Sequence, residues 1–282
     1  MSSVSELPVI ARQVRRDILR MVHAVNSGHP GGSLGCADYL TSLYFEYMKH
    51  DPNNFTGHGK GQDVFVMSNG HISPVFYSVL ARSGYFEISE LSTFRKINTR
   101  LQGHPTTHEG LPGVRVATGS LGQGMSVATG FALEKKLDND PSTVWVLTGD
   151  GELQEGQVWE AVMFAAHNKV DNMIVAVDFN QQQIDGSTGQ VMGITELKSK
   201  FLAFGWEVLE MDGNNYDSIH EVVPQAQAKL GGGKPIIIIM KTEMGQGVDF
   251  MMGTHAWHGK APNDEQLAEA LRQLPETPYG DY

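Results

Sequence analysis

The chain has 282 residues and a formal net charge of −11, from 21 Lys and Arg against 32 Asp and Glu. This acidic balance argues against a nucleic-acid binder, because neutralising phosphates requires clustered basic residues. With 40% hydrophobic and 19% charged residues, the composition is that of a globular protein that can bury a full core, which excludes a disordered or fibrous protein.

Three features bear on location. The lone cysteine, Cys36, cannot form an internal disulfide, and the first 16 residues lack the apolar stretch of a secretory signal. The longest apolar run, Ile236 to Met240, is far shorter than the roughly 20 residues that cross a bilayer. We therefore expect a cytoplasmic protein that does not span a membrane.

Helical patterns and short apolar runs alternate along the chain. Val14, Ile18, Met21, Val22 and Val25 fall on one face of a first helix. Further helices are predicted over residues 36–48, 73–82, 122–137, 157–168 and 216–230. Buried strands are predicted over residues 64–67, 144–148, 173–177, 206–209 and 236–240.

Continuous apolar strands are typical of a parallel sheet covered on both faces. Their alternation with helices predicts an α/β fold with a doubly wound, mainly parallel sheet flanked by helices. We expect one domain over residues 1–282, in which N-terminal helices and a polar C-terminal tail are additions to the sheet. Ligands in such folds bind at the carboxyl ends of the strands.

Polar residues follow two successive strands of this predicted sheet. Asp150 lies in a Gly-Asp-Gly segment directly after one strand, and Asn180 follows the next. Carboxylate and amide oxygens suit Mg²⁺, and the glycines let backbone N–H groups approach a phosphate. The pair therefore predicts a metal-held diphosphate, although Gly-Asp-Gly alone is more typical of a tight turn with Asp as a helix N-cap.

Gly- and His-rich segments accompany this pair in a fixed order. They are Ser27–Gly35, Ser68–His71, Gln102–Pro105, Thr118–Gly124, Gly149–Gly156, Ile184–Gly186 and Trp257–Gly259. In this order they resemble the diphosphate-binding half of the transketolases, enzymes that use thiamine diphosphate (ThDP). The resemblance extends from about Val9 to Pro262 and implies the ThDP-binding fold.

The resemblance also implies how the cofactor is held. Mg²⁺, with Ca²⁺ or Mn²⁺ able to substitute, would bridge the two phosphates through the side chains of Asp150 and Asn180 and the backbone carbonyl of Gln182. A backbone ligand tolerates Gln at this position, because the side chain has no role. The implied ThDP contacts are His71, Gly119, Leu121, Gly151, Asn180, Ile184 and His258.

Four residues are implied to be catalytic. The family equivalents of His29, His104 and His258 line the hydroxyls of the ketose donor and assist proton transfers, a role that suits imidazole near neutral pH. Glu155 resembles a carboxylate in a proton-sharing network at the dimer interface, with a first-turn Glu favoured by the helix dipole as the alternative.

The remaining histidines receive no catalytic role. His23 and His255 are predicted to be structural, and no function is predicted for His50, His58, His108, His167 and His220. Trp257 departs from the family pattern, and it would narrow the donor channel if it pointed inward.

Transketolases also need a second α/β domain that binds the aminopyrimidine of ThDP and supplies an activating glutamate. No second set of alternating strands and helices follows here. The resemblance therefore implies the N-terminal subunit of a split transketolase, acting in an α2β2 heterotetramer with a separately encoded C-terminal subunit. Together they would transfer a two-carbon ketol unit from a ketose phosphate to an aldose phosphate, and this chain alone would be inactive.

Three alternatives remain at this point. One is a related ThDP enzyme, such as a deoxyxylulose-phosphate synthase or the α chain of a ketoacid dehydrogenase. Another is a catalytically silent binding subunit that keeps the fold. The third is an unrelated doubly wound domain with glycine-rich turns.

Overall fold

Five parallel strands form the central sheet of the computed structural model, which describes residues 6–282. The strands lie in the order β1-β2-β3-β7-β6, and every neighbouring pair is parallel. Their bounds are β1 (Val64–Met67), β2 (Val144–Gly149), β3 (Met173–Phe179), β6 (Glu207–Asp212) and β7 (Ile236–Lys241). The predicted α/β fold with a parallel sheet is confirmed, while residues 1–5 of the predicted domain lie outside the described residues.

Polar and apolar residues do not alternate along the strands, because both faces of the sheet are covered. Val144 and Val146 of β2 belong to one buried cluster, whereas Trp145 and Leu147 belong to the other. Only the edge strand β6 is substantially exposed along its length. Burial on both faces therefore explains the continuous apolar runs in the sequence.

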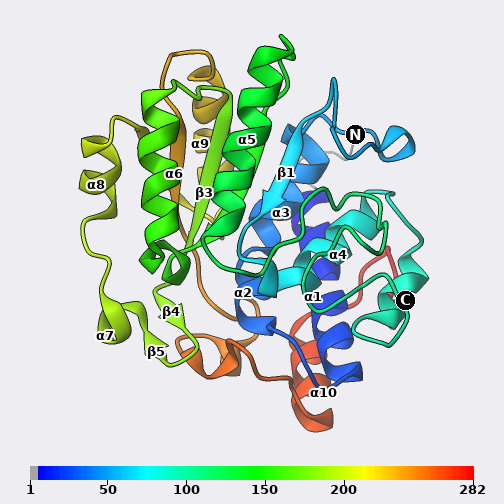
Figure 1. The fold of residues 1–282 in the computed structure, drawn as a ribbon. Coiled ribbons are helices and arrows are strands. Elements are labelled where there is room, and N and C mark those ends of the chain that lie inside the picture. Colours follow the sequence, from blue (N-terminus) through cyan, green and yellow to red (C-terminus); the bar gives the residue numbers. More distant parts are fainter. Residues whose placement is uncertain (1–5) are drawn as a thin grey trace.

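Helices cover both faces (Figure 1). One face packs against α5 (Gln123–Leu137), α6 (Gly156–His167) and α8 (Leu197–Ala203). The other packs against a larger group. Its members are α1 (Leu7–Ala24), α2 (Pro30–Gly35), α3 (Ala37–Ser42), α4 (Ser73–Arg82), α9 (Tyr216–Ala228) and α10 (Asp264–Gln273).

Short elements supplement this framework. A hairpin of β4 (Gln182–Gln183) and β5 (Gly186–Ser187) leads into α7 (Thr188–Met192). A π-helical turn, Leu43–Tyr47, ends the region predicted as one helix over residues 36–48. The 3₁₀ turns are Pro52–Asn54, Gly70–Ile72, Ile88–Thr93, Gly151–Gln154, Asp249–Met251 and His255–Trp257.

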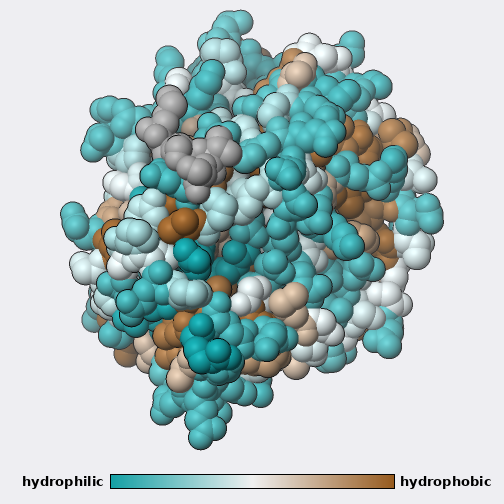
Figure 2. All heavy atoms as spheres, turned by 180° about the vertical axis from the view of Figure 1, so that it is seen from behind, coloured by the Kyte–Doolittle hydropathy of each residue, from teal (hydrophilic) through white to brown (hydrophobic). Residues whose placement is uncertain are grey.

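The surface is mostly polar on the face opposite to that of Figure 1. Figure 2 shows hydrophilic residues over most of it, with apolar residues in separate groups. No helix between residues 6 and 282 is long and apolar enough to cross a membrane.

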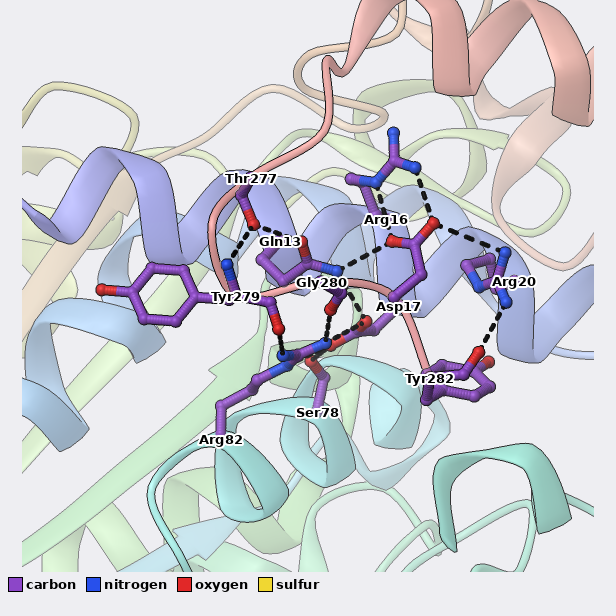
Figure 3. Close-up of polar contacts among 11 residues, drawn as sticks. Gln13, Arg16, Asp17, Arg20, Ser78, Arg82, Thr277, Tyr279, Gly280 and Tyr282 are labelled. Carbon is purple, nitrogen blue, oxygen red and sulfur yellow. Dashed lines mark hydrogen bonds and ion pairs between the residues drawn. The ribbon is translucent and has the colours of Figure 1, made fainter. Parts of the chain in front are cut away.

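The segment expected to be a polar tail is held against α1 (Figure 3). Arg16 donates two hydrogen bonds to Asp281, at 2.6 and 2.9 Å, and Thr277 donates to Gln13. Arg20 donates to the backbone oxygen of Tyr282 at 2.7 Å. The residues after α10 are therefore packed onto the first helix through charged and polar contacts.

Beneath this segment lies a buried ion pair between α1 and α4. Asp17 is fully buried, and its two carboxylate oxygens accept hydrogen bonds from Arg82, both at 2.9 Å. Ser78 donates a further bond at 2.7 Å, and Arg82 also donates to the backbone oxygens of Tyr279 and Gly280. Asp17 therefore ties together two helices and the C-terminal segment.

We expect Asp17→Ala to lower the free energy of unfolding by about 3–5 kcal/mol, because Arg82 would keep a buried charge without its partner. Urea denaturation measures this. The control is Glu269→Ala, which removes an ion pair with Arg272 on the exposed surface of α10 and should leave the midpoint nearly unchanged. Equal losses in the two variants would contradict the role assigned to the buried pair.

Candidate functional site

A cavity of about 470 Å³ opens at the carboxyl ends of β1, β2, β3 and β7. Parallel strands bring these ends to one edge of the sheet, as expected for the fold. The cavity lining contains the following predicted site residues: His29, His71, Gly119, Leu121, Asp150, Gly151, Glu155, Asn180, Gln182, Ile184 and His258. His104 is not part of the lining, but its ring centroid lies 6.3 Å from that of His29.

Two carboxylates lie together at the ends of β2 and β3. Gly149 pairs with Asp178 in the strand register, so Asp150 follows directly beside it. The Asp150 carboxylate accepts hydrogen bonds from the backbone N–H groups of Gly151 at 2.7 Å and Gln181 at 2.6 Å. Burial and the charge of Asp178 raise the pKa of Asp150 to about 7, and burial raises the pKa of Asp178 to about 6.

No Lys or Arg among residues 6–282 forms an ion pair with either carboxylate. Asp178 instead accepts from the Thr242 hydroxyl and from the Asn180 amide at 2.9 Å. Buried charges are ordinarily paired or bound to metal, so this concentration of oxygens fits a divalent cation. No group of three or more His, Cys, Asp or Glu side chains that could hold a metal ion is found in the described part of the chain, so such a cation would also need amide and carbonyl oxygens.

A glycine allows one histidine to approach the cavity. Gly119 has a φ of +123°, and a Cβ there would lie 2.5 Å from Cδ2 of His104. A side chain at this position would therefore displace the imidazole as well as strain the backbone. This contact packs the loop of His104 against the predicted ThDP-binding loop.

The cavity wall contains a cluster of imidazoles from separate parts of the chain. The ring centroids of His29 and His71 are 5.1 Å apart, those of His71 and His258 are also 5.1 Å apart, and those of His29 and His258 are 5.6 Å apart. Nδ1 of His29, Nδ1 of His258 and Oδ1 of Asn69 are buried and have no hydrogen-bond partner among residues 6–282. All three residues line the cavity, so polar groups of a ligand would satisfy these atoms.

Burial keeps these rings neutral. It lowers the pKa of His29 to about 4, with smaller contributions from His258, Arg95 and His104. Burial is also the largest cause of the lowered pKa of His71, His104 and His258. Each neutral ring has one donor and one acceptor nitrogen, a combination that suits the hydroxyls of a sugar.

The buried carboxylate of Glu152 was missed by the sequence analysis. It accepts hydrogen bonds from the Thr148 hydroxyl at 2.7 Å, from the N–H groups of Gly122 at 2.8 Å and Gly149 at 3.1 Å, and from the Ser68 hydroxyl. Glu152 therefore joins the ends of β1 and β2 to the loop before α5. Its position directly after Gly149-Asp150-Gly151 was the one sequence feature that could have indicated a role at the site. Other cavity residues without a predicted role are Gly32, Asn69, Gly149, Gln154, Asp178, Gln183 and Met244.

Trp257 does not narrow the cavity. Its side chain is 6% exposed and belongs to the core, and its indole N–H donates to the backbone oxygen of Phe250 at 2.9 Å. The indole is therefore packed in the core, and Trp257 is not part of the cavity lining. The conditional expectation that it restricts the substrate does not apply.

Two predicted residues lie exposed at the cavity rim. Ile184 at the turn of the β4–β5 hairpin is 57% exposed, although it is large and apolar. Glu155 is also exposed, and its side chain makes no capping hydrogen bond to α6. His23, by contrast, contacts Asp264 at 2.8 Å and so links α1 to α10, away from the cavity.

The amino-acid sequence matches a known protein family over nearly its whole length. Residues 9–282 match the family described as the thiamine diphosphate binding domain of transketolase. The chain belongs to the transketolase family. Its fold is also that of solved transketolases: the enzyme from Campylobacter jejuni superposes with a TM-score of 0.90 and 36% identity, over 100% of this chain and 44% of that one.

Relatives of similar length are named as subunits. A 6-deoxy-6-sulfo-D-fructose transketolase subunit from a Clostridium strain is 40% identical over 94% of both chains. An apulose-4-phosphate transketolase subunit from Actinobacillus succinogenes is 37% identical, over 96% of this chain and 97% of that protein. Human transketolase is 35% identical, but the match covers only 41% of its length. The chain thus corresponds to the N-terminal subunit of split transketolases.

The neutral state of His29 has a measurable consequence for this transketolase domain. The unfolded chain binds a proton at this residue below about pH 6.5, whereas the folded chain does so only near pH 4. Acidification from pH 6.5 to 4 therefore destabilises the wild type relative to His29→Asn, by up to about 3 kcal/mol. Denaturation of both proteins at several pH values tests this. A difference in unfolding free energy that stays constant from pH 7.5 to 4.5 would contradict the lowered pKa.

Proposed function

We propose that this chain acts with a separate C-terminal subunit to transfer a two-carbon ketol unit from a ketose phosphate to an aldose phosphate. The observation that carries the proposal is one cavity that combines two buried carboxylates, which have no Lys or Arg partner among residues 6–282, with a cluster of neutral histidines. The carboxylates suit a metal-bound diphosphate and the histidines suit a polyhydroxylated substrate. A related ThDP synthase or a silent binding subunit would share the first feature, so the assay below separates these functions.

The cofactor assignment follows the donor set. Asp150, Asn180 and the carbonyl of Gln182 would hold Mg²⁺, and Gly151 would lie close to the diphosphate. ThDP, when bound, supplies the carbon nucleophile and the electron sink for cleaving the bond between C2 and C3 of the ketose. Gly119, Leu121, His71 and Ile184 would form the remaining contacts with it.

The histidines would bind the sugar and move its protons. His29, His104 and His258 are neutral at pH 7, because burial lowers the pKa of each. A neutral imidazole can accept a proton from one hydroxyl while its other nitrogen donates a hydrogen bond to a second. The unpartnered Nδ1 atoms of His29 and His258 support this role.

A partner subunit would complete the site. Ile184 and Glu155 lie exposed at the cavity rim, where another chain would cover them and supply the activating glutamate. The outer faces of α5 and α6 also expose Val127, Met163 and Phe164. Exposed large apolar side chains of this kind support association, and we propose an α2β2 heterotetramer in the cytoplasm.

Replacing Asp150 by Ala should raise the Kd of ThDP for the assembled subunits more than about 100-fold, beyond the effect of residues that only support metal ligands. Calorimetry in the presence of Mg²⁺ measures this. The control, Asp138→Ala, removes an exposed carboxylate at the end of α5 and should bind normally. Unchanged binding by Asp150→Ala would remove this residue from the metal site.

The decisive experiment is a two-carbon transfer assay with xylulose 5-phosphate, ribose 5-phosphate, ThDP and Mg²⁺. We expect no activity from this chain alone and activity when the C-terminal subunit is added, because that subunit would supply the activating glutamate. His258→Ala should lower turnover of the mixture about 100-fold or more, in the range for loss of a general acid or base. An inactive mixture that still binds ThDP would favour the silent subunit or another sugar substrate.

A further inference from the structure

Arg95 lies between the two segments that contain His29 and His104. It follows the 3₁₀ turn Ile88–Thr93, and its backbone has a φ of +55°. One guanidinium nitrogen donates to the hydroxyl of Ser27 at 3.2 Å, and the other terminal nitrogen lies 3.5 Å from the backbone oxygen of Gly103. The positive charge of Arg95 contributes to the lowered pKa of both histidines. The guanidinium therefore lies beside the imidazoles assigned to the sugar.

The charge of Arg95 has no carboxylate partner among residues 6–282. Its Nε is buried and unbonded, and its two hydrogen bonds to neutral oxygens are long for a charged donor. Arg100 lies only five residues further along the chain, but its guanidinium is paired: it donates two hydrogen bonds to the Glu90 carboxylate, at 2.8 and 2.6 Å. In a chain with an excess of 11 negative charges, an arginine that has no carboxylate partner among residues 6–282 and lies beside the segments of His29 and His104 is suited to an anionic ligand.

The space for such a ligand is a hollow of about 310 Å³. It is lined by Val25, Ser27, Arg95, Gln102 and Gly103, with no acidic side chain in the lining. A planar guanidinium matches the paired oxygens of a phosphate or sulfonate, and Ser27 offers a hydroxyl beside it. The hollow thus provides room, charge and hydrogen-bond donors in one place.

We propose that Arg95 and Ser27 bind the anionic end group, a phosphate or a sulfonate, of the sugar whose hydroxyls contact His29 and His104. This inference rests on the proposed function and makes Arg95 a specificity-determining residue for charged over uncharged sugars. Two relatives are named for substrates with such groups, a 6-sulfo sugar and a 4-phosphate.

The test compares Arg95→Gln with wild type in the assembled two-subunit enzyme. For each substrate, kcat/KM is measured with and without the phosphate: ribose 5-phosphate against ribose, and xylulose 5-phosphate against xylulose. We expect kcat/KM to fall about 10- to 100-fold for at least one of the two phosphates, the range for losing hydrogen bonds to a charged group. The change should appear mainly in KM, and the uncharged counterpart should change less than about twofold.

Two further variants define the cause. Arg95→Lys keeps the positive charge but not the paired N–H donors of the guanidinium, so it should retain more activity towards the phosphates than Arg95→Gln. Arg100→Gln is the matched control, since it removes the same charge from the same loop but from a guanidinium already paired with Glu90. It should leave the ratio of charged to uncharged substrates unchanged. Equal losses for both substrate types in Arg95→Gln would overturn the proposal and make Arg95 a support for the histidine loops or a partner of a carboxylate on the other chain.

A binding measurement separates this inference from the proposed function. If the wild-type mixture transfers no two-carbon unit, the proposed function fails, and labelling of Arg95 by phenylglyoxal then decides the anion site. Phosphate, ribose 5-phosphate or the small sulfonate isethionate should slow the labelling of Arg95 at least fivefold, and ribose should not. Protection by phosphate compounds alone, or by isethionate alone, identifies the anion. Labelling unaffected by all three would overturn the proposal.

Discussion

The structure depends on two carboxylates buried at adjacent ends of parallel strands. Asp150 and Asp178 emerge side by side because the register of β2 and β3 aligns Gly149 with Asp178. With no cationic side chain against them in residues 6–282, burial raises the pKa of both, and the charge of Asp178 raises that of Asp150 further. A metal-bound diphosphate would relieve this cost, so the stability of the site and the binding of its cofactor are coupled.

A cluster of neutral histidines lies in the same cavity as the two carboxylates. They are buried enough to stay uncharged, and they come from the segments before α2, before α4 and before α10, which meet only in the folded chain. Glu152 holds the neighbouring loops together, because its carboxylate accepts hydrogen bonds from the backbone N–H groups of Gly122 and Gly149. Within residues 6–282 the chain therefore combines loops held by hydrogen bonds to Glu152 with imidazole and amide atoms that have no partner.

The outer rim of the cavity has the opposite character. Ile184 and Glu155 are exposed there, and an unpaired Arg95 lies beside the histidines. In the isolated chain, the apolar side chain of Ile184 is exposed to water, and the charge of Arg95 has no carboxylate partner among residues 6–282. Both would gain a role if the proposed anionic sugar and second subunit complete the site.

The sequence by itself determined the strands, their parallel arrangement and the position of Asp150 and Asn180 at the strand ends. It did so because buried parallel strands require continuous apolar runs, and the residue after such a run must emerge at the ligand-binding edge. The ordered motifs similarly indicated the family. Only the tertiary structure decided that Trp257 turns into the core, that Glu152 joins three segments, that the residues after α10 pack on α1, and that Arg95 is unpaired while Arg100 is paired. The physical reason is that side-chain direction and pairing depend on remote segments, whereas periodicity and strand ends are local properties of the chain.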